Sequence, residues 1–243
     1  MDLALKHKTV FLSGASGGIG QAIAQQLAAE GANVVVHFHR NRESADKIVA
    51  AIGADQSLAV GGNLSDEATV ASAFATTSER FGPIDILVAC AGVWPPEHTP
   101  IHDMTLTQWN TTLDNNLTST FLCCRAFIKQ AVEHDLQDPA IVLIGSTAAV
   151  FGEAGHGDYA ASKSGLTYGL MLTLKNEISR VASCGRVNTV CPGWTVTPMA
   201  EKFTDDGDSI KQALSTIALR KVASADDIAH AVLFLSSARV AGH

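Results

Sequence analysis

Tyr159 and Lys163 stand four residues apart inside a run of helix-forming residues. This spacing puts both side chains on one face of a helix, one turn apart. A tyrosine phenol has an ordinary pKa of about 10, so it is a poor acid or base at neutral pH. A neighbouring ammonium favours the phenolate and is expected to lower that pKa. The pair therefore predicts proton transfer to a carbonyl oxygen, or from an alcohol.

A cluster of glycines lies between the first expected strand and the first expected helix. The strand spans residues 8–13, the glycine-rich loop residues 14–20 and the helix residues 21–30, and a second strand follows at residues 33–38. Glycines allow tight turns and the close approach of a phosphate, and the helix N-terminus supplies N–H donors. A glycine-rich loop in this position predicts a dinucleotide site.

The end of the second strand carries basic rather than acidic side chains. His39, Arg40 and Arg42 come before the first acidic residue, Glu43. In a dinucleotide fold an acidic residue here accepts from the 2′-OH of NAD, whereas a basic one accommodates the 2′-phosphate of NADP. The sequence therefore favours NADP, and a solvated turn is the alternative interpretation.

Strands and helices alternate along the rest of the chain. Further strands are expected at residues 57–61, 84–89, 140–145 and 186–191, and helices at residues 44–52, 66–80, 108–133, 157–181 and 225–236. Ser65 is the expected N-cap of the helix at 66–80, and residues 194–217 are expected to be irregular and partly helical. The alternation predicts an α/β fold: a single-domain, Rossmann-like, doubly wound parallel sheet over residues 1–243, with helices on both faces.

Composition excludes several classes of protein. The net charge of −7 argues against sequence-independent nucleic-acid binding. Five cysteines without framework spacing indicate reduced thiols and a cytoplasmic location. No signal or transmembrane run is seen, so no membrane association is expected. The nine histidines form no ligand pattern, so no metal site is expected.

These motifs together resemble the classical short-chain dehydrogenase/reductase family over nearly the whole chain. Residues 13–20 are similar to its TGxxxGxG motif, with Ser13 for threonine, and residues 159–163 match its YxxxK motif. Ser146 lies thirteen residues before Tyr159, where the family has its catalytic serine, and Asn116 lies where it has its catalytic asparagine. Within the family the chain is most similar to 3-oxoacyl-[acyl-carrier-protein] reductases.

The resemblance implies a set of functional residues. The implied catalytic residues are Asn116, Ser146, Tyr159 and Lys163, with Asn116 positioning a water that links Lys163 to solvent. The implied NADPH-binding residues are Gly14, Ser16, Gly17, Gly18, Ile19, Gly20, His39, Arg40, Asn63, Leu64, Cys90, Ala91, Gly92, Tyr159, Lys163, Pro192, Gly193, Thr195 and Thr197. The substrate pocket is expected to be lined by residues 94–96, 152–156 and 194–203.

Three departures from the family pattern stand out. Ala89 and Cys90 replace its paired asparagines, so their side-chain contacts with the cofactor cannot form. Asn63 replaces the aspartate that often contacts adenine. The family also usually adds a last strand beyond the position of His243, so a truncated sequence is one interpretation, and the oligomeric state stays open.

Several functions remain open at this point. The expected activity is NADPH-dependent reduction of a 3-oxoacyl thioester ketone. Alternatives within the family are a pteridine reductase, which residues 37–40 also resemble, or a sugar or secondary-alcohol dehydrogenase. An alternative of another class is a non-catalytic NADP-binding sensor. The resemblance also implies a homotetramer or dimer that contacts through the helices at 108–133 and 157–181.

Overall fold

A parallel sheet forms the centre of the molecule in the computed structural model, which describes residues 2–197, 214–215 and 217–240. Its strands are β1 (Thr9–Ser13), β2 (Asn33–Phe38), β3 (Ser57–Gly61), β4 (Ile86–Ala89), β5 (Ala140–Ile144) and β6 (Arg186–Val190). They lie in the order β3-β2-β1-β4-β5-β6, and each pairs in parallel with its neighbour. The order reverses beside β1, which confirms the predicted doubly wound sheet.

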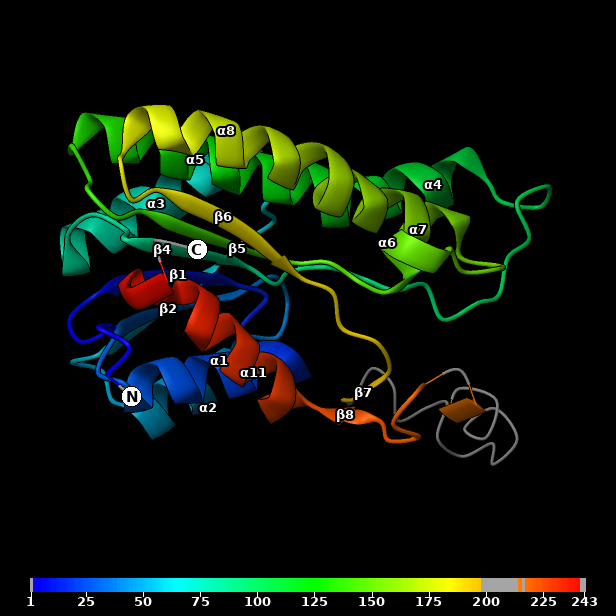
Figure 1. Cartoon of the computed structure of the whole chain (residues 1–243), viewed down its shortest axis with the longest axis horizontal. Helices are drawn as coiled ribbons and strands as arrows, with labels where there is room; N and C mark the ends of the chain where they lie inside the picture. Colours follow the sequence, from blue (N-terminus) through cyan, green and yellow to red (C-terminus); the bar gives the residue numbers. More distant parts are fainter. Residues whose placement is uncertain (1, 198–213, 216, 241–243) are drawn as a thin grey trace.

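Helices cover both faces of this sheet (Figure 1). One face carries α1 (Gly18–Ala29), α2 (Arg42–Ile52) and α11 (Ala225–Ser236), and the other carries α3 (Glu67–Phe81), α5 (Ser119–Glu133) and α8 (Met171–Val181). Each face has its own apolar core of buried strand and helix side chains. Burial on both faces explains why the strands are continuous apolar runs. None of the helices in the described part of the chain is long and apolar enough to cross a membrane.

The two long helices expected from the sequence are each interrupted by a wider turn. The first consists of α4 (Leu106–Leu113), the π-helical turn η1 (Asp114–Thr118) and α5. The second consists of α7 (Gly157–Ser164), the π-helical turn η2 (Gly165–Leu170) and α8. Such turns add one residue to a helical repeat and are frequent at functional sites. The predicted boundaries of both helices lie within two residues of the observed ones.

Several local expectations need correction. Asp66, not Ser65, caps α3, because its carboxylate accepts from the backbone N–H of Thr69 at 2.9 Å. Helix α1 begins at Gly18, three residues earlier than expected. The short helix α6 (Ala148–Phe151) was not expected, because four residues are too few to show a helical period.

A small second sheet follows β6 along the chain. It pairs β7 (Thr195–Val196) with β8 (Ala223–Ser224) in parallel. Ser224 then begins α11 with a capping box, in which its hydroxyl and the Asp227 carboxylate each bond the other residue's N–H. Most of the stretch expected to be irregular, residues 194–217, lies outside the described residues.

Candidate active site

One long cleft lies across the carboxyl ends of the central strands, with a volume of about 1440 Å³. Every residue expected in the site lines this cleft except Asn116, which is fully buried behind it. The expected residues that line it are Gly14, Ser16, Gly17, Gly18, Ile19, Gly20, His39, Arg40, Asn63, Leu64, Cys90, Ala91, Gly92, Ser146, Tyr159, Lys163, Pro192, Gly193, Thr195 and Thr197. The fold thus gathers motifs from the whole chain into one volume.

Two glycines of the glycine-rich segment, Gly14 and Gly20, have no room for a side chain. Gly14 has a φ of +66°, and a Cβ there would lie 2.6 Å from the Cα of Ala91. A Cβ on Gly20 would meet the carbonyl oxygen of Gly14. Gly17 caps α1 without a side-chain hydrogen bond. The N-terminus of the helix therefore opens on the cleft without a side-chain cap, as an anion site requires.

Ser13 fixes the neighbouring loop after β4. Its hydroxyl accepts from the backbone N–H groups of Cys90 and Ala91, both at 3.0 Å. This oxygen holds the segment where the family's asparagines are replaced. Burial raises the pKa of the Cys90 thiol to about 11, against a smaller opposing effect of Lys163, so the thiol is neutral at physiological pH.

The end of the cleft near β2 and β3 is polar. His39 and Arg40 are exposed there, which leaves their basic groups accessible to a ligand. The side-chain oxygen of Asn63 accepts from the N–H of Ser65 at 3.1 Å and from its hydroxyl at 3.0 Å. That oxygen is used to order its own loop.

Ser146 and Tyr159 face each other from two elements. Ser146 follows β5, and its hydroxyl accepts from the N–H of Ala148, the first residue of the short helix α6, at 3.1 Å. Tyr159 lies on α7, one turn before Lys163. Burial raises the pKa of Tyr159, a hydrogen bond with Ser146 opposes this, and the charge of Glu153 adds to the rise.

The net lowering of the Tyr159 pKa that was expected from Lys163 is not found, because burial raises that pKa. The Lys163 Nζ lies 5.8 Å from the centre of the Tyr159 ring and donates to the carbonyl oxygen of Ile144 at 2.8 Å. Burial lowers the pKa of Lys163 itself to about 8, against smaller effects of Cys90 and Cys191. An ammonium is expected to act on the phenol through space, but burial of the phenol is the larger effect here.

Asn116 lies in the π-helical turn η1, and its side chain is bound to protein groups. Its Oδ1 accepts from the N–H of Val93 at 2.7 Å, and its Nδ2 donates to the carbonyl oxygen of Val93 and the hydroxyl of Ser162, both at 3.0 Å. A Cβ on Gly92 would lie 3.1 Å from the Asn116 Oδ1 and 3.3 Å from the Lys163 Nζ. Asn116 thus joins three elements behind Lys163.

Asp158 is a buried residue of the site that the sequence did not single out. Its carboxylate accepts from the hydroxyl of Thr112 at 2.7 Å, from the Gln108 side chain at 3.3 Å and from the backbone N–H of Tyr159 at 2.9 Å. It is fully buried. An acidic residue in the first turn of a helix was the available signal, and it ties α7 to α4.

The opposite end of the cleft has an aromatic wall. Trp94 donates from Nε1 to Glu153 Oε1 at 3.1 Å and stacks on the ring of buried His156, with ring centres 4.4 Å apart. Trp94, Pro95, Pro96, Gly152, Glu153 and Trp194 from the expected substrate pocket line this end. Thr195 and Thr197 of the expected pocket also line the cleft, whereas Ala154, Gly155, His156 and Val196 do not, and residues 198–203 lie outside the described residues.

The loop after β6 closes the cleft on its last side. The carbonyl oxygen of Pro192 accepts from the N–H of Thr147 at 2.9 Å, next to Ser146. Thr195 donates from its hydroxyl to the carbonyl oxygen of Gly193 at 3.0 Å. The short sheet of β7 and β8 holds Thr195 in this position.

The fold and cleft define a class: a doubly wound α/β protein with a dinucleotide-type loop beside a tyrosine, a serine and a lysine. A family model described as enoyl-(acyl carrier protein) reductase matches residues 14–242. A 3-oxoacyl-[acyl-carrier-protein] reductase of Synechocystis is 33% identical over 237 residues, covering 96% of this chain and 91% of the relative.

Two further relatives with the same enzyme name are similar to this chain to the same degree. The 3-oxoacyl-[acyl-carrier-protein] reductase FabG of Staphylococcus aureus is 33% identical, covering 95% of this chain and 91% of its own. The FabG of Staphylococcus epidermidis is 32% identical, covering 95% and 92%. The chain belongs to the short-chain dehydrogenase/reductase family and is an oxidoreductase acting on a carbonyl or hydroxyl group.

Proposed function

We propose that this protein is an NADPH-dependent reductase of ketones of the 3-oxoacyl thioester type, with Tyr159 as the proton donor. The observation that carries the proposal is the meeting of Ser146, Tyr159 and Lys163 in the cleft that the glycine-rich loop opens. The names of the relatives support the substrate class. A soluble cytoplasmic location is part of the same proposal.

The cleft fits a nicotinamide dinucleotide. Gly14 packs against the backbone of Ala91, where any side chain would clash, so the loop backbone stays open to a pyrophosphate. The N-terminus of α1 has no side-chain cap, which leaves its N–H groups available to the same phosphates. The exposed His39 and Arg40 suit a 2′-phosphate and favour NADPH over NADH. Thr195 and Thr197 would hold the carboxamide side. When bound, the cofactor supplies the hydride.

Two hydroxyls would polarise the substrate carbonyl. Ser146 and Tyr159 would each donate to its oxygen, at the point where negative charge develops during reduction. The raised pKa of Tyr159 keeps the phenol protonated at neutral pH, so it can deliver its proton to that oxygen. Lys163 would hold the ribose and supply positive charge behind the phenol.

The residues also bear on the alternatives. A pteridine reductase or an alcohol dehydrogenase would use the same hydroxyls, so only a substrate panel separates them. A non-catalytic NADP sensor would not need a buried, protonated tyrosine beside Ser146. That arrangement favours an enzyme.

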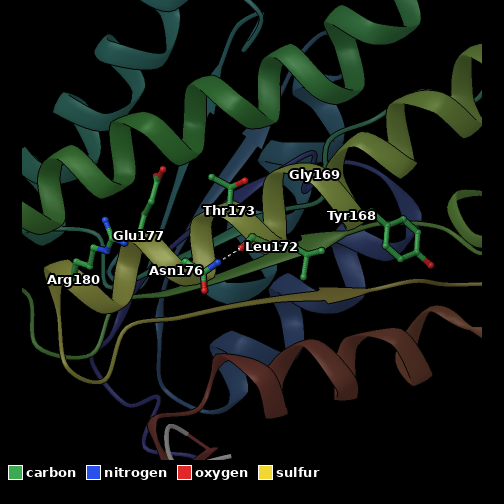
Figure 2. Close-up of a pocket in the computed structure, with 7 residues that line it drawn as sticks. All are labelled: Tyr168, Gly169, Leu172, Thr173, Asn176, Glu177 and Arg180. Atoms are coloured by element: carbon green, nitrogen blue, oxygen red, sulfur yellow. Dashed lines mark hydrogen bonds between the residues drawn. The ribbon is translucent and has the colours of Figure 1, made fainter.

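The outer surface of the second long helix supports the expected oligomer. Figure 2 shows a shallow groove there, lined by Tyr168, Gly169, Leu172, Thr173, Asn176, Glu177 and Arg180. Tyr168 is 52% exposed and Leu172 is 42% exposed, and Phe121 on α5 is 43% exposed. Apolar side chains on unpartnered helices favour a homo-oligomer through these helices. A monomer in sedimentation velocity would contradict this.

The test is NADPH oxidation with an acetoacetyl thioester, compared with NADH and with the Tyr159→Phe variant. We expect turnover with NADPH that falls by about 100-fold or more in Tyr159→Phe. A crotonyl thioester provides the control for carbon–carbon reduction. NADPH binding without turnover of any carbonyl or alcohol in a wide panel would favour the sensor instead.

A further inference from the structure

His37 is buried beneath the glycine-rich loop, at the carboxyl end of β2. Its exposure is 2%, and its ring stacks on Phe11, with ring centres 6.2 Å apart and planes 29° apart. His37 is also one of the residues that line the cleft. The mechanism above gives this residue no role, although it is the most buried of the basic side chains near the cofactor end.

Both ring nitrogens of His37 bond to the backbone of loops on either side. The N–H of Gly14 donates to Nδ1 at 3.2 Å, so Nδ1 must carry no proton. In a neutral imidazole Nε2 then carries the proton, and it donates to the carbonyl oxygen of Gly62 at 3.0 Å. These two bonds fix a single tautomer.

The two glycines belong to two of the loops that form this end of the cleft. Gly14 begins the loop between β1 and α1, and Gly62 begins the loop between β3 and α3, just before Asn63. Both have positive φ values, +66° and +143°. The main chain of β2 adds further ties, since the N–H of Ala15 donates to the carbonyl oxygen of His37 at 2.9 Å. The imidazole is thus a side-chain bridge between two loops that no strand pairing joins directly.

We propose that His37 is a positioning residue of the cofactor site, and that its neutral ring sets the distance between the pyrophosphate loop at Gly14 and the adenosine loop at Gly62. The inference rests on the proposed cofactor site. It gives β2 a function of its own, beside the proposed 2′-phosphate contacts of His39 and Arg40 in the loop that follows the strand. Because both bonds lie on the protein side, His37 acts through the loops and not through contact with the reacting atoms.

The neutral form is required and is the one that the surroundings favour. A protonated Nδ1 could not accept from Gly14. Burial lowers the pKa of His37 to about 4, the bond to Gly62 opposes this, and the charge of His39 adds to the lowering. The bridge therefore stays intact throughout the neutral range.

The alternative is that His37 only fills the core beside Phe11 and Phe74. Replacing His37 with an apolar residue separates core packing from loop bridging, because it preserves the packing but leaves the Gly14 N–H and the Gly62 carbonyl unpaired. Replacing His37 with a polar residue tests the bond to Gly14 and the bond to Gly62 one at a time. Asparagine places an acceptor near the position of Nδ1, and glutamine places a donor near the position of Nε2.

The test is the dissociation constant of NADPH, measured by the change in nicotinamide fluorescence, for the wild type and for His37→Phe, His37→Asn and His37→Gln. We expect His37→Phe to raise that constant by about tenfold or more, since two buried backbone groups lose their partner. The single-bond variants should lie between it and the wild type. The effect should appear in the dissociation constant and KM of NADPH, with a much smaller change in kcat and in the KM of the carbonyl substrate.

Phe74→Leu provides the matched control, because Phe74 packs on Phe11 with ring centres 4.9 Å apart and bonds neither glycine. Equal weakening in Phe74→Leu and His37→Phe would overturn the proposal in favour of packing. Wild-type affinity in a folded His37→Phe would also overturn it. If that variant does not fold, wild-type affinity in both His37→Asn and His37→Gln would overturn it equally. A wild-type protein that binds no nicotinamide cofactor would instead refute the proposed function, and this inference with it.

Discussion

Lys163 donates a hydrogen bond from Nζ to the carbonyl oxygen of Ile144, 2.8 Å away, and so joins helix α7 to the end of the central strand β5. The ammonium is buried, and burial lowers its pKa to about 8. Lys163 therefore both anchors the helix that carries Tyr159 and titrates near the physiological range. A lysine on a solvated helix face would do neither.

The first prediction concerns the alkaline limit of activity. Since Lys163 loses its proton as the pH rises through about 8, kcat/KM for carbonyl reduction should fall above that pH. In Lys163→Arg the guanidinium keeps its charge far beyond this range, so the fall in kcat/KM above about pH 8 (the alkaline limb) should be absent, although the activity of the variant is low. Lys163→Met should lose about 100-fold or more at all pH values. The measurement is a pH profile from about 6 to about 10, and an unchanged alkaline limb in Lys163→Arg would contradict the assignment.

The second prediction concerns the charge beside the proton donor. Glu153 raises the pKa of Tyr159, so Glu153→Gln should lower it. In the oxidation direction the phenolate is the active form, and the profile of alcohol oxidation should therefore move to lower pH. Glu177→Gln removes the same charge from the outer surface of α8 (Figure 2) and should leave the profile in place. A shift of equal size in both variants would point to the net charge instead.

The third prediction concerns the hydroxyl that faces Tyr159. The hydrogen bond with Ser146 lowers the pKa of the phenol, so Ser146→Ala should raise it and move the oxidation profile to higher pH. The same variant removes one donor to the developing oxyanion, which should lower kcat by about 100-fold. The two variants, Ser146→Ala and Glu153→Gln, should thus shift the profile in opposite directions, and a shared direction would be inconsistent with this site.

Much of this arrangement follows from the sequence, for physical reasons. Strands β2 and β3 and helix α11 have the predicted boundaries, because buried apolar runs and a capping serine mark them locally. All of the residues that the family motifs implied, apart from Asn116, also line the cleft. The pairing of β7 with β8 joins two-residue strands that lie far apart in the chain, and no local pattern encodes it.

The features of the cleft that the sequence did not predict depend on tertiary structure. The pKa of Tyr159 depends on how deeply the phenol is buried, and the partner of Lys163 is a backbone carbonyl, which carries no signature in the sequence. The bridge made by His37 is hidden in the same way, since both of its partners are backbone groups of glycines. Sequence patterns therefore predicted the set of side chains, while the structure supplied their contacts with the main chain.

The fourth prediction concerns the stability that Asn116 provides. Its amide satisfies both backbone groups of Val93 and is fully buried. Asn116→Ala should lower the free energy of unfolding by about 1–3 kcal/mol, because these groups are left unpaired. Asn115 lies in the same π-helical turn and bonds the Thr111 carbonyl oxygen within its own helix, so Asn115→Ala should cost much less. Urea unfolding followed by circular dichroism measures both, and equal losses would contradict the special role of Asn116.

The last prediction concerns acid stability and His37. The folded-state pKa of about 4 lies below the ordinary value of 6.5, so between these values the unfolded chain binds more protons than the folded one. Stability should therefore fall as the pH drops from about 6.5 to about 4, by up to about 3 kcal/mol from this group alone. Other groups titrate in this range as well, so the informative quantity is the difference between the wild type and His37→Asn. Asparagine does not titrate, and the stability of the variant should approach that of the wild type as the pH falls. A difference that stays constant from about pH 7 to about pH 4 would show that His37 is not held neutral in the folded protein.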